Sequence, residues 1–455
     1  MQHHLKRILS VLAIATAVQS ASAFSLLGPF APWEVARIGY NPLNTDIGGP
    51  MNLGEEYRWN IRTVYYGFDS SFLNYFGAQG QQAIRQAVGI LNAVPPASAM
   101  SAELTEFPLN TRRVNYQASG LGLLDLKSYA LAFMLEEMGP ASSERYTWTL
   151  RNRSEVNQTV FYAVIRRNFD PVTWVPSSYV NGVLYTYAIQ EFQQPDWADA
   201  VELQVDPLQF GFNTVISAAD GLLDGFLSPG EFFTGLTRDD IGSLRYIYRQ
   251  NNYNVEQLLP GTQGGGPGGG SGSPWTPWPP PGGGGTNNMV DTALRPGIDK
   301  VNFQEAQYDS LLGSFIVFTN AFSDTFVSNS TIFSQSVQRI VVQPDLVFLA
   351  EDLGVTVPTG VPVRLTRTVT DGWANNSALN GQAALDGPGV IQPQVQISFS
   401  NAGPYIINAT PFLLTESRNI LVGGPWGLFD GSTNTPIIFP NGLSIQMMEQ
   451  MVLGR

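Results

Sequence analysis

The hydrophobic pattern of residues 123–139, LLDLKSYALAFMLEEMG, predicts the best-defined helix of the chain. Asp125 is a favourable N-cap, good helix formers follow it, and Gly139-Pro140 is a stop signal. Apolar residues recur at helical spacing, at Leu131, Met134, Leu135 and Met138. Lys127 and Glu136 are expected on a solvated face, so we interpret the helix as an apolar strut that holds an N-terminal sheet together.

Two more helices are predicted on either side of this one. Residues 79–92 have apolar positions on one side, and Asp69-Ser70-Ser71 caps the segment that leads into them. Residues 237–249, TRDDIGSLRYIYR, begin with Thr237 and Asp240 at capping-box spacing. Both segments are amphipathic, which is typical of helices that cover a sheet.

Strand patterns dominate the rest of the chain. Residues 62–68 are predicted as a strand, four candidates lie between Tyr146 and Leu208, and Asn181-Gly182 favours a type I′ hairpin turn. After Met289 almost no helical pattern remains, and seven or more short strands with turn signals predict a β-sandwich. Residues 260–288, in which two glycine tracts flank PWTPWPPP, are predicted to be a linker.

The N-terminus has the pattern of a secretory signal peptide. MQHHLKR is basic, Ile8–Val18 is apolar, and Ala21-Ser22-Ala23 has the form that signal peptidase recognises. Crossing a bilayer takes roughly 20 apolar residues, so this shorter run is not expected to stay in a membrane. The expected organisation is a signal peptide over 1–23, an α+β domain over 24–259, the linker over 260–288, and an all-β sandwich domain over 289–455.

The amino-acid composition excludes several classes of site and partner. The chain has no cysteine, and its only histidines, His3 and His4, leave with the signal peptide. This excludes Ser-His-Asp and Cys-His triads, zinc sites of the His/Cys type, and disulfides. The mature chain keeps 22 basic residues against 37 acidic ones, so its net charge changes from −13 to −15. Such a charge disfavours nucleic acid and an anionic membrane as partners.

Two segments resemble the secreted metzincin proteases, the matrixins in particular. VYYGFDSSFLNYFGAQGQQAIRQAVGILNAV is similar to the opening strand and long helix of their catalytic domain, and GLTRDDIGSLRYIYR is similar to its closing helix. The resemblance implies a metzincin-like sheet with two or three helices. With Gly139 aligned to the glycine of the zinc motif, Ala132, Phe133, Glu136 and Ser142 stand where His, Glu, His and the third His belong. The implied domain is therefore degenerate and has lost its zinc ligands and its proteolytic activity.

One loop has partial calcium-site spacing. Residues 220–231, DGLLDGFLSPGE, follow an EF-hand-like loop at Asp220, Asp224, Ser228 and Glu231, but Leu222 replaces a ligand. The alternative is a turn-rich loop with scattered acids. No other cofactor is expected.

Carboxylates are the remaining acid–base groups, and none of their close pairs is arranged for catalysis. Glu136-Glu137 would point apart on a helix, and the helix dipole accounts for Asp239-Asp240 in a first turn. Glu351-Asp352 reads as a solvated turn, and Asp430-Gly431-Ser432 reverses the aspartic-protease order. Trp275 and Trp278 of the linker either contact a glycan or pack on neighbouring prolines.

Three function classes remain. The first is a secreted, non-catalytic structural or adhesive protein, a subunit of an extracellular or cell-surface assembly whose partners are itself or other secreted proteins. In that case an arm over residues 24–40 or a sandwich edge strand would pair with the next copy. The alternative is a carboxylate-based carbohydrate-active enzyme or glycan-binding protein with a polysaccharide partner. The third class is a divergent metalloprotease-like peptidase.

Overall fold

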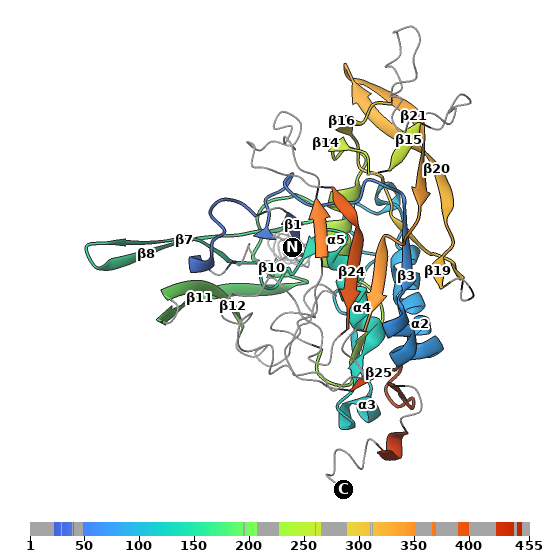
Figure 1. The fold of residues 1–455 in the computed structure, drawn as a ribbon. Coiled ribbons are helices and arrows are strands. Elements are labelled where there is room, and N and C mark those ends of the chain that lie inside the picture. The colour runs from blue at the N-terminus through green and yellow to red at the C-terminus, as the bar shows by residue number, and fades with distance from the viewer. Residues whose placement is uncertain are drawn as a thin grey trace, which may run out of the picture.

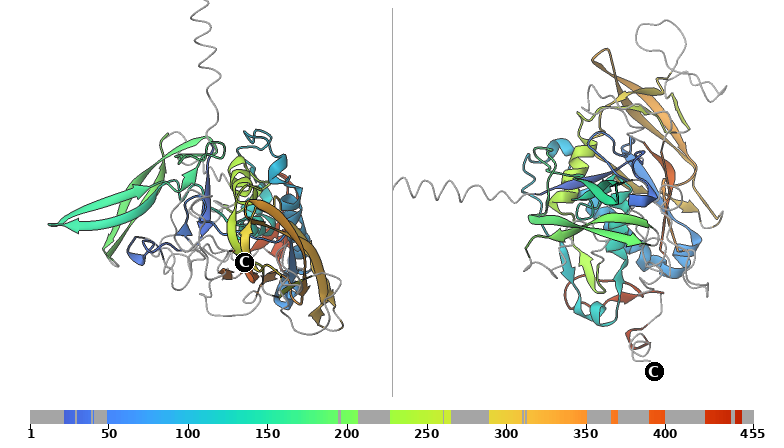
Figure 2. Two further views of the ribbon diagram at one scale, coloured as in Figure 1. Left: turned by 90° about the horizontal axis from the view of Figure 1, so that it is seen from above. Right: turned by 90° about the vertical axis from the view of Figure 1, so that its left-hand side faces the viewer.

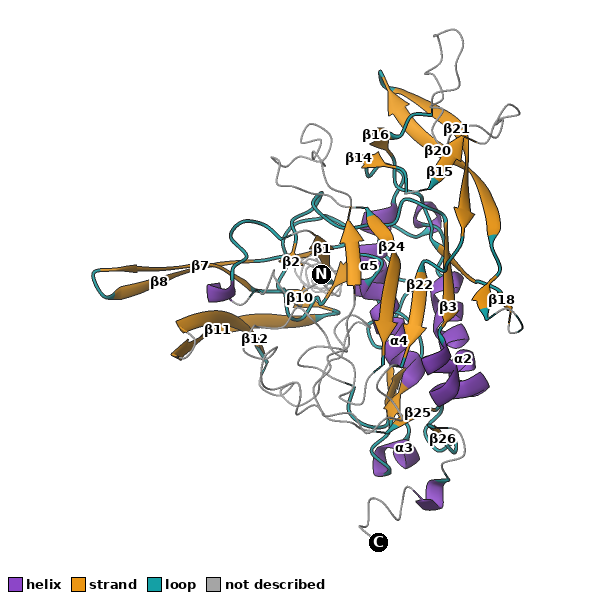
Figure 3. Cartoon of the chain, in the orientation of Figure 1, coloured by secondary structure: helices purple, strands orange, loops and turns teal. Residues whose placement is uncertain are grey.

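The computed structural model describes most of the chain between Ser22 and Met447. The described residues are 22–28, 30–38, 40, 49–193, 196–206, 227–259, 261–264, 289–309, 311, 313–350, 366–369, 390–399, 425–440 and 444–447. They form a mixed α/β structure in which strands outnumber helices, as expected for the α+β class (Figure 1, Figure 3). Within these ranges no helix is both long and apolar enough to cross a bilayer.

The centre of the fold is a five-stranded sheet with the order β17-β3-β22-β24-β23. The first four strands run parallel, and β23 closes the edge antiparallel. The strands are β3 (Thr63–Phe68), β17 (Asn302–Glu305), β22 (Leu346–Leu349), β23 (Thr366–Val369) and β24 (Ile391–Ser398).

Helices α2 (Ser70–Ala93) and α4 (Leu126–Glu136) pack together against this sheet. The predicted caps are confirmed, because Asp69 accepts from the Phe72 N–H and Asp125 accepts from the Ser128 N–H. Helix α2 ends at its C-cap, Val94, which is followed directly by Pro95. Aromatic rings fill the space between helices and sheet. The contacting rings have centroids 4.8 to 6.4 Å apart, among Phe68, Phe72, Phe76, Phe133, Phe348 and Phe399.

The strand pairing differs from the expected division into an N-terminal domain and a separate sandwich. Strand β3, from the first half, lies between β17 and β22, which both follow residue 289. Strand β25 (Trp426–Leu428) likewise pairs with β5 (Leu124–Asp125) next to α4. Short apolar runs such as LVFL suit a buried parallel strand as well as a sandwich strand, so periodicity alone could not reveal this pairing.

A second five-stranded sheet contains strands from before, within and after the expected linker. Its order is β14-β16-β20-β21-β15. The strands are β14 (Asn254–Gln257), β15 (Thr262–Gly264), β16 (Thr292–Arg295), β20 (Phe318–Ser328) and β21 (Thr331–Val341). Residues 262–264 of the expected linker therefore belong to a strand, and residue 260 and residues 265–288 lie outside the described residues.

Two long hairpins project from the core as one unit, which we call the wing (Figure 1, Figure 2). It consists of β7 (Thr149–Val156) with β8 (Thr159–Ile165), and of β11 (Val183–Gln193) with β12 (Asp196–Gln204). Strand β10 (Tyr179–Val180) joins β11 through the predicted Asn181-Gly182 turn. Both turn residues have positive φ, 40° and 89°, as a type I′ turn requires.

The expected N-terminal arm is part of the core. Strand β1 (Phe24–Gly28) is buried along its whole length and pairs with β2 (Gly49–Pro50), β6 (Pro140–Ala141) and β9 (Asn168–Phe169). Its edges are thus occupied by this chain, and β1 is not available to pair with the next copy. The physical reason is its apolar sequence, FSLLG, because burying apolar side chains away from water lowers the free energy of the chain.

Helix α5 (Arg238–Tyr248) has the predicted capping box, because the Thr237 and Asp240 side chains each bond the other residue's backbone N–H. The remaining elements are short. They are η1 (Ala36–Ile38), η2 (Ala97–Ala99), β4 (Arg112–Val114), α3 (Tyr116–Gly120), β13 (Glu231–Phe233), β18 (Tyr308–Asp309), β19 (Ser314–Phe315) and β26 (Ile437–Ile438).

Candidate functional site

The α4 positions that would carry a zinc site in a metzincin are filled by core packing. Ala132 and Phe133 are fully buried, and the Phe133 ring lies 5.9 Å from that of Phe399. Ser142 is buried and its hydroxyl accepts a hydrogen bond from the Arg145 N–H at 3.1 Å. Across the described ranges, no group of three or more His, Cys, Asp or Glu residues is placed to hold a metal ion.

The predicted solvated face of α4 is wrong, because every residue of the helix is buried. Helix α2 covers one side of α4, and strands β6, β13 and β25 lie on its others. Lys127 extends over the Phe232 ring, with its ammonium 5.1 Å from the ring centroid and 4.0 Å from the Asp125 carboxylate. Glu136 is 5% exposed. The helix is therefore a strut, as expected, but one that is enclosed on all sides.

Half of the calcium-loop residues can be placed. Asp220 and Asp224 lie outside the described residues, as do Trp275 and Trp278. The Ser228 N–H donates to Glu231 Oε2 at 2.8 Å, and Glu231 Oε1 lies 3.3 Å from an Arg112 guanidinium nitrogen. In this structure Glu231 closes a turn and pairs with an arginine, and calcium binding stays a prediction.

The acidic pair at the start of α5 does more than interact with the helix dipole. Asp239 is fully buried, and its two oxygens accept hydrogen bonds from the backbone N–H groups of Ala23 and Asn181, at 2.9 and 2.7 Å. It therefore joins α5 to the residue before β1 and to the turn between β10 and β11. Asp430, of the reversed aspartic-protease triplet, is exposed and accepts from Asn434 at 2.7 Å. Glu351 and Asp352 lie outside the described residues.

A network of buried ion pairs that sequence reasoning missed lies where the two large sheets meet. Arg58 pairs with Glu256, and Arg295 makes two bonds to Asp324, at 2.9 and 3.1 Å. All four side chains are nearly inaccessible to solvent. Burial raises the pKa of Glu256, and Arg58 opposes that shift. The only signal in the sequence was Glu256, a charged residue in the short strand NVEQ. Alternation of polar and apolar residues does not show whether such a residue points into the protein or lies on an exposed edge strand.

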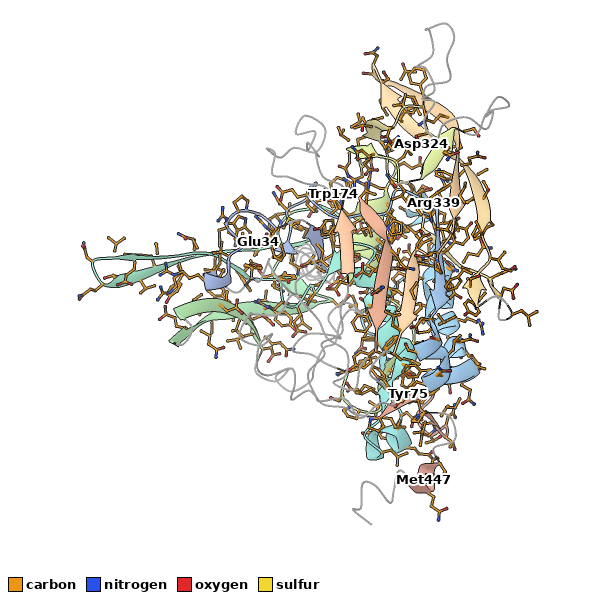
Figure 4. The ribbon with its side chains drawn as sticks, in the orientation of Figure 1. Glu34, Tyr75, Trp174, Asp324, Arg339 and Met447 are labelled. Carbon is orange, nitrogen blue, oxygen red and sulfur yellow. The ribbon has the colours of Figure 1, made fainter. Side chains whose placement is uncertain are left out.

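Glu34 is a second buried acid that the sequence did not single out (Figure 4). It is 1% exposed, and Oε2 accepts from the Ala31 N–H. Burial raises the pKa of Glu34 to about 8, although the Ala31 hydrogen bond and Arg167 lower it. A Cβ on Gly49 would stand 2.1 Å from Oε1, so only glycine allows this close approach. The Glu34 carboxyl is enclosed by protein, so its protonation state affects the stability of the fold.

Two recesses adjoin at the C-terminal end of α5 and share Gln250 in their lining. The first, the Trp174 recess, has a volume of about 330 Å³ and also includes Tyr246 and Arg249. The second, the Tyr253 recess, has a volume of about 290 Å³ and also includes Arg62. The buried Arg295–Asp324 pair forms its floor. Both concave surfaces combine aromatic and polar groups, as binding sites for small molecules commonly do.

In the Trp174 recess a guanidinium packs against two aromatic rings, Trp174 and Tyr246, which contact each other edge to face with centroids 5.5 Å apart. The Arg249 Cζ atom is 4.5 Å from the Trp174 ring centroid and 3.8 Å from that of Tyr246. Trp174 has a left-handed φ of 59°. The Asp170 carboxylate bonds the Val172 and Thr173 N–H groups, and this fixes the loop that presents Trp174. Strained non-glycine residues of this kind occur often at functional sites.

Comparisons with protein families, with curated proteins and with solved structures found no match for this chain.

Proposed function

We propose that the protein is a secreted, non-catalytic structural or adhesive subunit that assembles with copies of itself through the wing. The observation that carries the proposal is a rigid projection with apolar side chains on both of its outer faces. The enclosure of α4, where the resemblance to metzincins would place catalysis, agrees with a role that does not need an active site.

Ion pairs hold the base of the wing. Arg145 makes a bidentate contact with Asp199, at 2.7 and 2.8 Å, and lies 3.6 Å from Glu202. Burial alone lowers the pKa of Arg145, whereas these two carboxylates raise it well above its ordinary value. Further out, Arg153 of β7 pairs with Glu191 of β11 at 2.9 Å. These contacts join the two hairpins, so the wing acts as one body rather than as two free loops.

The inner faces of the hairpins contact each other, and their outer faces carry exposed apolar residues. Leu150, Ala198 and Ala200 belong to a buried cluster that Tyr162, Val164 and Ile189 extend. On the outer face of β7 and β8, Val156 and Phe161 are more than half exposed. On the outer face of β11 and β12, the exposed residues are Leu184, Leu203 and Val205.

Unlike outer faces on one projection favour head-to-tail contacts between copies. When the face of one copy meets the other face of the next, each copy keeps one face open and the assembly can extend. Burying an exposed leucine or phenylalanine at such a contact stabilises it by about 1.5–3 kcal/mol. The strong negative charge of the chain opposes close approach of copies, so assembly should strengthen with salt.

The test is the mass of the purified mature protein in solution as its concentration rises, measured by sedimentation velocity. We expect wild type to form larger species, and Phe161→Asp or Leu203→Asp to stay monomeric. Leu311→Asp is the matched control, because Leu311 is 94% exposed but lies outside the wing. Assembly that is unchanged in both wing variants would refute the role of the wing.

The second candidate function, glycan binding, is favoured by the two adjoining recesses rather than by the wing. Its original sequence signals, Trp275 and Trp278, lie outside the described residues. The recesses are lined by other residues, Trp174 in the first and Tyr253 in the second among them.

A further inference from the structure

We propose that the two adjoining recesses at the C-terminal end of α5 form one binding site for an acidic oligosaccharide, with one uronic-acid ring in each recess. The proposal goes beyond assembly through the wing, because neither recess includes a residue of the two long hairpins. It rests on the volumes of the recesses, on the aromatic surface in each, and on which polar groups remain available to a ligand.

The volumes of the two recesses suit small ring-shaped ligands. Sites for drug-sized ligands usually measure about 300–1,000 Å³. At about 330 and 290 Å³, each recess is at the lower end of that range, which suits one sugar ring. Because both recesses are lined by Gln250, a linear chain of two or more linked rings can occupy them together.

Each recess offers an aromatic side chain at its surface. Trp174 is 40% exposed although Arg249 covers part of its ring. Tyr253 and Phe322 are half-buried in the second recess. Sugar rings have apolar C–H faces, and stacking such a face on an aromatic ring removes both from water. The recesses thus provide two stacking surfaces at adjacent positions (Figure 4 labels Trp174 in the first recess and Asp324 in the second).

The charged groups of the lining divide into those already used and those still available. Arg245 donates to the carbonyls of Ser101, Ala102 and Pro171 and is committed to structure. Asp324 is bonded by Arg295 and by Gln335 at 2.7 Å, so its oxygens are satisfied.

Glu256, which also lines the second recess, is buried and pairs with Arg58. The charges that remain at the surface of the recesses are positive. Arg249 donates to the Tyr246 carbonyl and interacts with the Tyr246 side chain, and Arg62 is exposed and makes no ion pair with any residue that the structure describes. Their remaining N–H groups favour a ligand that accepts hydrogen bonds, and a guanidinium matches a carboxylate in a bidentate fashion. Gln250 donates to Asp299 at 3.1 Å, which leaves its carbonyl oxygen for a sugar hydroxyl.

Together these features select a saccharide that carries carboxylates. A neutral saccharide would use the stacking surfaces but offer no carboxylate to either guanidinium group. A simple carboxylic acid would bind one arginine but fill neither recess. A uronic-acid oligomer uses both, and it presents one carboxylate to Arg249 and another to Arg62.

The experiment is isothermal titration of the mature protein with a galacturonate trimer, with a maltose-series trimer as the neutral probe of equal length. We expect saturable binding of the acidic trimer, at least tenfold weaker binding of the neutral trimer, and weakening of acidic binding at high salt. Galacturonate monomer should bind at least tenfold more weakly than its trimer, because it fills a single recess.

Two single variants test the assignment separately. Trp174→Ala should weaken acidic-trimer binding at least tenfold by removing the stacking surface, and Arg62→Ala should do so by removing an exposed charge that no fold contact needs. Arg113→Ala is the matched control, since it removes an exposed arginine elsewhere. No saturable binding of the acidic trimer, equal binding of the neutral one, or full affinity in both variants would overturn the proposal. Phe161→Asp should keep full trimer affinity, so failure of assembly and failure of this site are distinguishable.

Discussion

The carboxylate of Asp239 accepts a hydrogen bond from the backbone N–H of Asn181 at 2.7 Å, although 58 residues separate the two in sequence. The same carboxylate accepts from the N–H of Ala23, the last residue of the expected signal peptide. In the chain that retains Ala23, a single acid thus joins the first turn of α5 to the turn between β10 and β11 and to the residue before β1.

Asp239→Asn should lower the free energy of unfolding by about 2–3 kcal/mol. In the chain that retains Ala23, the amide keeps one acceptor oxygen but turns its NH₂ group toward a backbone N–H, which leaves a buried donor without a partner. Urea unfolding followed by circular dichroism measures the loss. Asp430→Asn, at an exposed position, is the control, and equal stability of the two variants would contradict the role of Asp239.

Glu34 predicts a specific pH dependence of stability. Because its folded pKa is raised from 4.5 to about 8, the folded state holds one proton more than the unfolded state between these values. Its contribution to stability is therefore full below pH 4.5 and is lost as pH rises toward 8, with a slope of up to about 1.4 kcal/mol per pH unit.

Glu34→Gln keeps an acceptor for the Ala31 N–H but cannot ionise. We expect its free energy of unfolding to exceed that of wild type at pH 8 and to vary less from pH 5 to 8. Thermal unfolding across this range is the measurement. Glu155→Gln, which removes an exposed carboxylate, should keep the wild-type profile, and a Glu34→Gln profile parallel to wild type would contradict the assignment.

The buried Arg295–Asp324 pair predicts non-additive effects of mutation. Asp324→Leu alone leaves the arginine buried without its carboxylate and should cost about 3–5 kcal/mol. The double variant Arg295→Met/Asp324→Leu removes both charges and should recover most of that loss. The measurement is a double-mutant cycle by urea unfolding with both single variants and the double variant. Simple additivity of the free-energy changes of Arg295→Met and Asp324→Leu would show that the pair is not coupled.

Calcium provides a fourth prediction. If Asp220 and Asp224 join Ser228 and Glu231 around an ion, millimolar calcium should raise the melting temperature of wild type, because a ligand that binds only the folded state stabilises it. Asp224→Asn should abolish that shift. An unchanged wild-type melting temperature would refute calcium binding by this loop. Glu231 would then only close its turn and pair with Arg112.

Local features of this fold could be predicted from the sequence, and its long-range pairing could not. The caps of α2, α4 and α5 and the Asn181-Gly182 turn depend on neighbouring residues, so their signals are present in short segments. The placement of β3 between β17 and β22 depends on strands more than 200 residues away, and no local pattern encodes it.

The candidate sites follow the same division. Lys127 and Glu136 look like a solvated face until α2 and the surrounding strands enclose α4. The two recesses bring Trp174, Gln250 and Arg62 together from three distant segments, none of which carries a recognisable motif. Burial and proximity of this kind result from the tertiary fold, and only the structure reveals them.

The most direct test of assembly is electron microscopy of the concentrated mature protein. We predict extended arrays or filaments in wild type, and their loss in the Phe161→Asp/Leu203→Asp double variant at equal concentration and with an unchanged circular dichroism spectrum. Uniform single particles in wild-type material at every concentration would contradict the account.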